Sequence, residues 1–168
     1  MDAPVVAQLV TAGAAVVALG AAVWQLRSTR RQAREAATHA YIARLTEAEF
    51  TKHLARSMDA LRLGEHPTEH EIEVRWRRFA RLKHEQQIEI AAPFNMFESV
   101  AGLYNRNLVT RGIIEHQLEN TAIVVFQRIE WWVTASRTRN RGYFREWELM
   151  LGWFAERRLR AAWHTSRP

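Results

Sequence analysis

The sequence predicts an all-α protein in which one N-terminal transmembrane helix continues into a long amphipathic helix, followed by a compact helical domain of about four helices. Three observations support this fold class. Residues 3–26 form a run of 24 residues without a charge. From Gly20 to Gly64 no further proline or glycine interrupts a helix. No part of the chain alternates apolar and polar residues with the period of two that half-buried strands show.

The uncharged run has the length of a membrane span. A helix needs about 20 mostly apolar residues to cross a hydrocarbon core of about 30 Å. A buried helix of a soluble protein seldom exceeds about 20 residues without a charged face. A cleaved export signal would carry basic residues before its apolar segment, but only Asp2 precedes this run. We therefore expect a transmembrane anchor over residues 1–27.

Basic residues that follow the run predict its orientation. This membrane-proximal basic cluster consists of four arginines: Arg27, Arg30, Arg31 and Arg34. Because basic flanks stay on the cytoplasmic side, the N-terminus should face outward and the rest of the chain should lie in the cytoplasm. The predicted location is the inner (plasma) membrane, crossed once, with anionic lipid headgroups around the arginines.

A long membrane-proximal helix is predicted over residues 28–63. Apolar residues recur there at spacings of mostly three to five, which fits one face of a helix: Tyr41, Ile42, Leu45, Phe50, Leu54, Met58 and Leu61. The simplest expectation is one uninterrupted helix from Pro4 to Leu63, with a bend near Ser28 or Thr29 left open.

The cytoplasmic helical domain is predicted over residues 64–168. Gly64 and Pro67 are typical of a helix end. Thr68 followed by Glu71 is the capping-box signature of a new helix, which should continue to Ala91. The apolar face of that helix is expected to comprise Ile72, Trp76, Phe79 and Leu82.

Three more helices complete the predicted domain. Pro93 either kinks a long helix or begins a new one, and Gly112 should end that element. Its inward residues are expected to be Phe94, Phe97, Ala101, Tyr104 and Leu108. Helices over residues 115–135 and 143–163 follow, and the inward face of the second is expected to comprise Phe144, Trp147, Leu151, Phe154 and Leu159.

The composition argues against several classes of chemistry. The chain has no cysteine, so it has neither disulfides nor thiolate metal sites. Asp2 and Asp59 are its only aspartates, which argues against a magnesium-dependent phosphoryl-transfer centre. No glycine-rich phosphate loop and no GxSxG turn is present. We expect no enzymatic activity, no cofactor and no metal.

Two histidines in "HPTEH" have a spacing that could suit a metal ion. His66 and His70 are four positions apart, but Pro67 and the cap at Thr68 separate them. No other ligand pattern lies nearby, so we favour a solvated turn over a metal site.

Asn95 and Glu98 form the candidate polar core or site. They lie three apart in an aromatic-rich segment, where desolvation would raise the pKa of the carboxyl group. One interpretation is an acid/base or ligand-binding group. We favour the other, a hydrogen-bonded pin between helices, because buried charges are usually paired. The candidate partners are Arg106, Arg111 and Arg128.

A second group of arginines is the candidate basic binding loop, made of Arg137, Arg139 and Arg141 with Arg145 beside them. These residues could contact the phosphates of lipid headgroups or of nucleic acid. Nucleic acid is the less favoured partner, because no groove-reading motif surrounds the loop. After residue 34 the chain holds 20 basic and 17 acidic residues, so the domain is only mildly basic.

The order of these features resembles a known family. The segments "FNMFESVAGLYNRNLVTRGII" and "GYFREWELMLGWFAERRL" look like those of the bacterial and phage proteins grouped as domain of unknown function 4760. The resemblance rests on Asn95, Phe97 and Glu98, and on the element from Trp147 to Trp153. Met96 and Pro93 depart from the pattern. The resemblance implies a fold and a topology over most of residues 28–165, and no reaction.

Three hypotheses about function follow. The first is a single-pass membrane protein whose cytoplasmic helical domain is an adaptor, sensor or regulatory module that binds a protein partner or a second copy of itself. A small-residue stripe in the anchor, Ala14, Ala18 and Ala22, would allow self-association, although alanine is also a common filler. The alternative is a lipid-headgroup or nucleic-acid binder acting through the arginine-rich loop. An enzyme using Glu98 is the least favoured.

Overall fold

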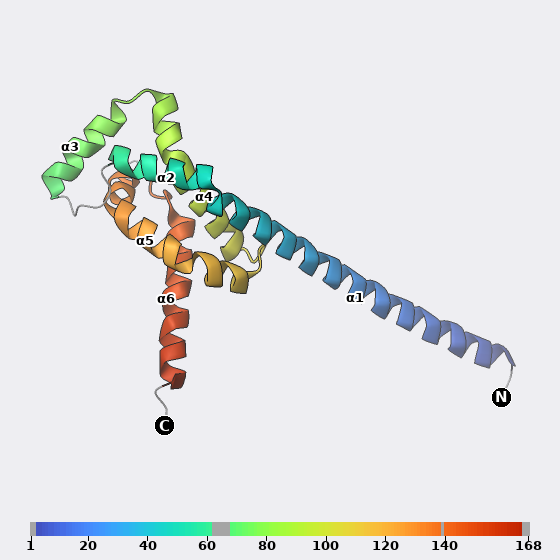
Figure 1. Ribbon diagram of the computed structural model, residues 1–168. Helices are drawn as coiled ribbons and strands as arrows, with labels where there is room; N and C mark the ends of the chain where they lie inside the picture. The colour runs from blue at the N-terminus through green and yellow to red at the C-terminus, as the bar shows by residue number, and fades with distance from the viewer. Residues whose placement is uncertain (1–2, 62–67, 139, 166–168) are drawn as a thin grey trace. The chain divides into compact units, whose positions relative to one another are not determined.

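The computed structural model describes residues 3–61, 68–138 and 140–165, and for residues 3–14, 16, 161 and 163–165 it describes the backbone alone. These residues form six α-helices and no strand (Figure 1): α1 (Ala3–Thr46), α2 (Ala48–Leu61), α3 (Glu69–Ala80), α4 (His84–Asn105), α5 (Arg111–Arg137) and α6 (Arg145–Thr165). The predicted all-α class is therefore confirmed.

The chain divides into two compact units, residues 1–37 and residues 38–168. The expected single helix from Pro4 to Leu63 is instead two helices, because a bend at Glu47 separates α1 from α2. Just before the bend, the hydroxyl of Thr46 donates a hydrogen bond to the carbonyl of Ile42 at 3.0 Å. Such a contact with the preceding turn often bends a helix. On the other side, the carbonyl of Glu47 accepts the N–H of Thr51 at 3.0 Å and so begins α2.

The membrane span was predicted for residues 1–27, and most of its side chains lie outside the described set. Where side chains are described, no helix contains a segment that is long and apolar enough to cross a membrane. Residues 1–14 and 16 are not among those side chains.

The predicted capping box starts α3. The N–H of Thr68 donates to Glu71 Oε2 at 2.7 Å, and the N–H of Glu71 donates to Thr68 Oγ1 at 3.4 Å. The helix that follows is shorter than expected, because the predicted element up to Ala91 is divided between α3 and α4. Gln87 holds the turn between them, since its amide nitrogen lies 3.0–3.3 Å from the carbonyls of Phe79, Ala80 and Leu82.

The boundary between α4 and α5 also differs from the prediction. Gly112 does not end a helix but lies in the first turn of α5. The chain instead leaves α4 after Asn105 through Asn107, which has a φ of 57°. Asparagine adopts this left-handed conformation more readily than most residues, so it can end the helix without glycine.

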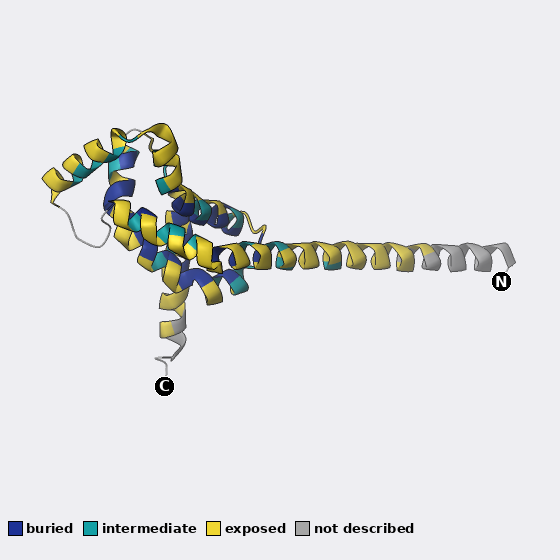
Figure 2. Ribbon diagram, turned by 45° about the horizontal axis from the view of Figure 1, so that its top comes forward, coloured by how far each residue is buried: buried dark blue, intermediate teal, exposed yellow. Residues whose placement is uncertain are grey.

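In the unit of residues 38–168, α4 packs against α2, α5 and α6. Figure 2 shows the buried residues gathered where these helices face one another, with exposed residues on their outer sides. Trp132 is fully buried at the centre, and four aromatic rings surround it with centroids 5.5–5.6 Å away: Phe79, Phe94, Tyr143 and Phe144. Phe97 stacks on Trp147 at 4.6 Å. Most of the predicted inward residues are buried, but Leu108 and Leu159 are 49% and 64% exposed.

We predict that Trp132→Ala lowers the free energy of unfolding by about 3–5 kcal/mol, because it leaves a cavity among four rings. Chemical denaturation of the purified full-length chain, followed by circular dichroism, measures this change. Trp153→Ala is the matched control, because Trp153 is 46% exposed and should cost less than about 1 kcal/mol. Equal losses in the two variants would contradict the central role of Trp132.

Candidate functional site

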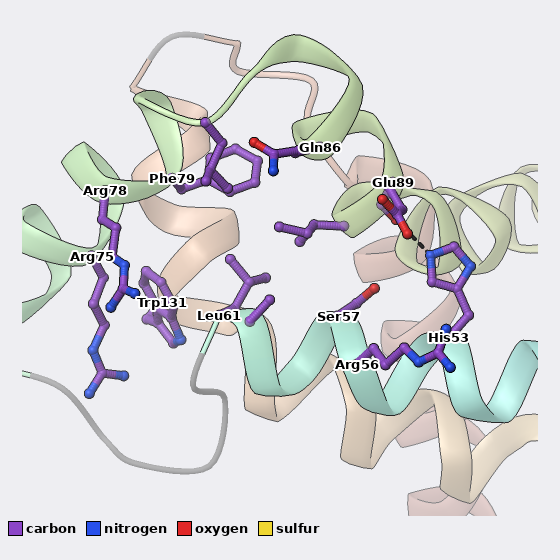
Figure 3. Close-up of a pocket in the computed structure, with 13 residues that line it drawn as sticks. His53, Arg56, Ser57, Leu61, Arg75, Arg78, Phe79, Gln86, Glu89 and Trp131 are labelled. Atoms are coloured by element: carbon purple, nitrogen blue, oxygen red, sulfur yellow. Dashed lines mark hydrogen bonds between the residues drawn. The ribbon is translucent and has the colours of Figure 1, made fainter.

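A pocket of about 360 Å³ lies among α2, α3, α4 and α5, all within the unit of residues 38–168 (Figure 3). It has an apolar interior and a polar mouth. Its lining comprises His53, Arg56, Ser57, Ala60, Leu61, Arg75, Arg78, Phe79, Leu82, Gln86, Glu89, Ile90 and Trp131. The volume is within the range of small-molecule sites in proteins, about 300–1,000 Å³.

The apolar interior of the pocket comes from all four helices. Leu61 of α2 is 5% exposed and Trp131 of α5 is 8% exposed, while Phe79 of α3 and Ile90 of α4 are partly buried against the core. The Trp131 indole N–H is buried and has no hydrogen-bond partner among the described residues.

Pro93 accounts for a hydrogen bond between α2 and α4 beside the pocket. A proline inside a helix has no N–H, so the carbonyl four residues earlier loses its helical partner. In α4 that carbonyl belongs to Glu89. His53 of α2 lies with Nε2 2.8 Å from it (Figure 3). Because a carbonyl oxygen only accepts, His53 must donate from Nε2, and this bond joins α2 to α4 beside the pocket.

The mouth of the pocket is basic. Arg75 and Arg78 reach it from α3, and Arg56 reaches it from α2 on the other side of Leu61 (Figure 3). The Arg75 guanidinium lies 5.9 Å from the centre of the Trp131 ring. Glu89 is the one carboxylate among the lining residues. The arrangement therefore places a surplus of positive charge around an apolar interior, which can hold an anion attached to an apolar group.

Asn95 and Glu98, the candidate polar site, have different surroundings in the structure. Asn95 is exposed, whereas Glu98 is half-buried against α6. The N–H of Glu146 donates to Glu98 Oε1 at 3.0 Å, and the N–H of Trp147 donates to Oε2 at 2.8 Å. These amides belong to the first turn of α6, where no helical acceptor exists. Glu98 thus caps α6 from α4, and its hydrogen bonds go to backbone amides rather than to an arginine.

Burial raises the pKa of Glu98 above its ordinary value of 4.5, and the two backbone hydrogen bonds partly counteract this shift. Both carboxylate oxygens are occupied. A carboxylate at the N-terminus of a helix also interacts favourably with the helix dipole. The geometry is that of a pin between α4 and α6. Asn105, which donates to the carbonyl of Glu146 at 2.8 Å, supplies a second attachment.

The candidate basic binding loop has one member that is occupied by structural contacts. Arg137 donates to the carbonyl of Tyr143 at 3.0 Å and pairs with Glu148 at 2.9 Å, so it clamps the end of α5 to the start of α6. Arg141 is exposed. Arg139 lies outside the described residues.

The membrane-proximal basic cluster lies on α1, and Arg27, Arg30, Arg31 and Arg34 are all exposed. Arg31 pairs with Glu35 one turn later at 2.9 Å. Of the two histidines considered for a metal, His70 lies in the first turn of α3 and His66 falls outside the described residues. The described part of the chain contains no group of three or more histidine, aspartate or glutamate side chains placed to hold a metal ion.

The pocket was not predicted from the sequence, although part of its residue pattern is visible there. His53 and Arg56 are three apart on α2, as are Arg75 and Arg78 on α3. Residues with this spacing share a helix face. What the sequence does not contain is the packing of α2 on α4 and of α3 on α5, which brings these helix faces to one pocket.

Comparison with known proteins gives a family but no relative of known activity. The family described as Domain of unknown function (DUF4760) matches residues 12–153. No curated protein matches the chain, and no solved structure does. The match covers α2 to α5, most of α1 and the first part of α6.

We predict that Glu98→Ala lowers the free energy of unfolding by about 1–3 kcal/mol, because two amides of α6 lose their acceptor. Glu98→Gln keeps one acceptor oxygen and should cost less. Denaturant unfolding of the full-length chain measures both variants. Asn95→Ala is the control, because Asn95 is exposed on the same helix. If Glu98→Ala unfolds like Asn95→Ala, Glu98 is not a pin.

The pH dependence of the same variants gives a second readout. Because the pKa of Glu98 is raised in the folded chain, the folded chain holds this proton more tightly than the unfolded chain. The contribution of Glu98 to stability is then greatest below the ordinary pKa of 4.5 and falls as the pH rises through the folded pKa. Relative to Glu98→Gln, which does not titrate, the wild-type chain should lose stability over this interval. A difference that rises with pH would contradict the direction of the shift.

Proposed function

The chain belongs to the DUF4760 family, and from this premise we propose that it is a single-pass membrane-anchored protein whose cytoplasmic helical domain is an adaptor, sensor or regulatory interaction module. The observation that carries the proposal is the apolar surface of α1. Val17 and Trp24 are each 72% exposed, and Leu19 is 67% exposed. Large exposed apolar side chains in one continuous run favour a cover other than water.

Lipid is the cover that the sequence favours. The exposed residues belong to the 24-residue uncharged run of residues 3–26, and α1 is helical from Ala3 onward, so the backbone polar groups of the run are satisfied within the helix. The four arginines that follow are exposed and suited to anionic headgroups. Their position supports an outward N-terminus and a cytoplasmic domain.

A partner-binding role is supported by a small apolar patch on α6. Leu149 and Trp153 lie one turn apart and are 48% and 46% exposed. The guanidinium of Arg111 lies 5.6 Å from the centre of the Trp153 ring. Tryptophan and arginine are the residues that most often dominate the binding energy of protein interfaces. We infer that a protein partner or a second copy of the chain contacts this patch.

Two other functions have less support. The enzyme hypothesis depended on Glu98, but both of its oxygens accept backbone amides, which favours a structural role. The headgroup or nucleic-acid hypothesis depended on the loop arginines. Arg137 is held by Glu148 and the carbonyl of Tyr143, so the loop offers fewer charges than its sequence indicates.

We predict that Val17→Arg releases the full-length chain from membranes. The nine valines and leucines of residues 3–26 contribute only about −0.3 to −0.6 kcal/mol each, and a central arginine costs about 2.5–3.5 kcal/mol. High-speed centrifugation without detergent measures the distribution between membrane and supernatant. Gln32→Arg adds the same charge beyond the run and should stay in the membrane. A wild-type chain found in the supernatant would refute the anchor. Protease should reach the domain in inside-out vesicles and not in intact spheroplasts.

We predict that Trp153→Ala lowers the yield of a crosslinked partner from native membranes by about tenfold, as expected for a central interface residue. Chemical crosslinking followed by mass spectrometry identifies the partner, including a second copy of the chain. Val74→Ala is the control, because Val74 is 52% exposed on a different helix. A chain that stays monomeric and yields no partner would count against the interaction module.

A further inference from the structure

We propose that the pocket among α2, α3, α4 and α5 binds a small organic anion, in which one phosphate or carboxylate group is attached to an aromatic or aliphatic body. This goes beyond the interaction module, because it adds a ligand to the helical domain. It rests only on the lining residues of α2, α3, α4 and α5, so the membrane anchor and the pocket can fail independently.

The arginines at the mouth of the pocket favour a ligand with an anionic group. Arg56 and Arg78 are exposed at the pocket and make no ion pair with any described residue. Other arginines of this unit are paired with nearby carboxylates, as Arg77 is with Glu73 at 2.5 Å and Arg137 is with Glu148 at 2.9 Å. Guanidinium groups at the pocket suit a phosphate or carboxylate, which accepts charge-assisted hydrogen bonds from arginine.

The apolar lining of the pocket favours a ligand that also carries an apolar ring or chain. Leu61, Phe79, Ile90 and Trp131 line the space. A free inorganic anion would leave this apolar surface in contact with water. A ligand with an attached ring or short chain removes that surface from water, which favours its binding over that of the bare anion.

The size of the pocket favours a small molecule over a macromolecule. The space of about 360 Å³ is bounded by four helices. A nucleic acid would require a continuous basic track along its backbone. A peptide would require an extended groove or an exposed strand edge. Arg56, Arg75 and Arg78 instead line one pocket.

The test uses the full-length chain in a nonionic detergent and 1-naphthyl phosphate as the probe, with equilibrium dialysis as the measurement. Inorganic phosphate supplies the charge alone and 1-naphthol supplies the ring alone. We expect saturable binding of 1-naphthyl phosphate that is at least about tenfold tighter than either half. Arg56→Gln combined with Arg78→Gln should weaken binding about tenfold or more, because charge-assisted hydrogen bonds are lost.

Matched variants separate the pocket from the rest of the surface. Ala60→Phe fills the pocket without changing its charge and should abolish saturable binding. Ala55→Phe, exposed on the same helix but outside the lining, should bind as the wild type does. Arg77→Gln removes an arginine of α3 that pairs with Glu73 and should also bind normally. Circular dichroism verifies that each variant is folded.

Several results would overturn the proposal. Equal binding of inorganic phosphate would indicate a site for the anion alone, and equal binding of 1-naphthol would indicate a purely apolar cavity. Absence of saturable binding, or unchanged binding in Ala60→Phe, would remove the pocket as the site. Tighter binding of an acidic peptide than of 1-naphthyl phosphate would assign the pocket to a protein segment.

Discussion

The attachment of α6 to α4 is the constraint on which the helical domain depends. Glu98 accepts the first amides of α6, and the neighbouring Phe97 stacks on Trp147, whose own amide is one of those two. A polar cap and an aromatic stack therefore fix the same turn. Phe144, which precedes α6 with a φ of 54°, is held in this uncommon conformation by contacts with Trp132 and Tyr143. Backbone strain of this kind persists only where the surroundings hold it in place.

Helical periodicity predicted the fold class and most of the core, but it did not predict where helices end against one another. Leu108 and Leu159 follow the apolar spacing of their segments and are nevertheless exposed. Leu108 comes after α4 has ended. Leu159 lies beyond Phe154, the last fully buried residue among the described side chains of α6. The bend at Glu47 had no proline or glycine to mark it, and beyond it α2 packs on α4.

The candidate polar site at Glu98 also shows what the sequence can predict and what only the packing of helices decides. Glu98 stood out in the sequence because a carboxylate among aromatic residues must find partners, and an arginine was the expected partner. Its partners could not be predicted, since they are backbone amides 48 and 49 positions away. The pocket was hidden for a related reason. Its arginines sit on solvated helix faces, where charge is ordinary, and only the tertiary arrangement brings them to one opening.

Pro93 would ordinarily be regarded as a defect in α4. Its missing N–H leaves the carbonyl of Glu89 without a helical donor, and His53 supplies one from α2. His53 and Pro93, 40 positions apart in the chain, therefore act together. The carbonyl that Pro93 leaves without a donor in α4 is where α2 is attached. A replacement that restored an N–H at position 93 would make the imidazole share the carbonyl of Glu89 with a helical donor.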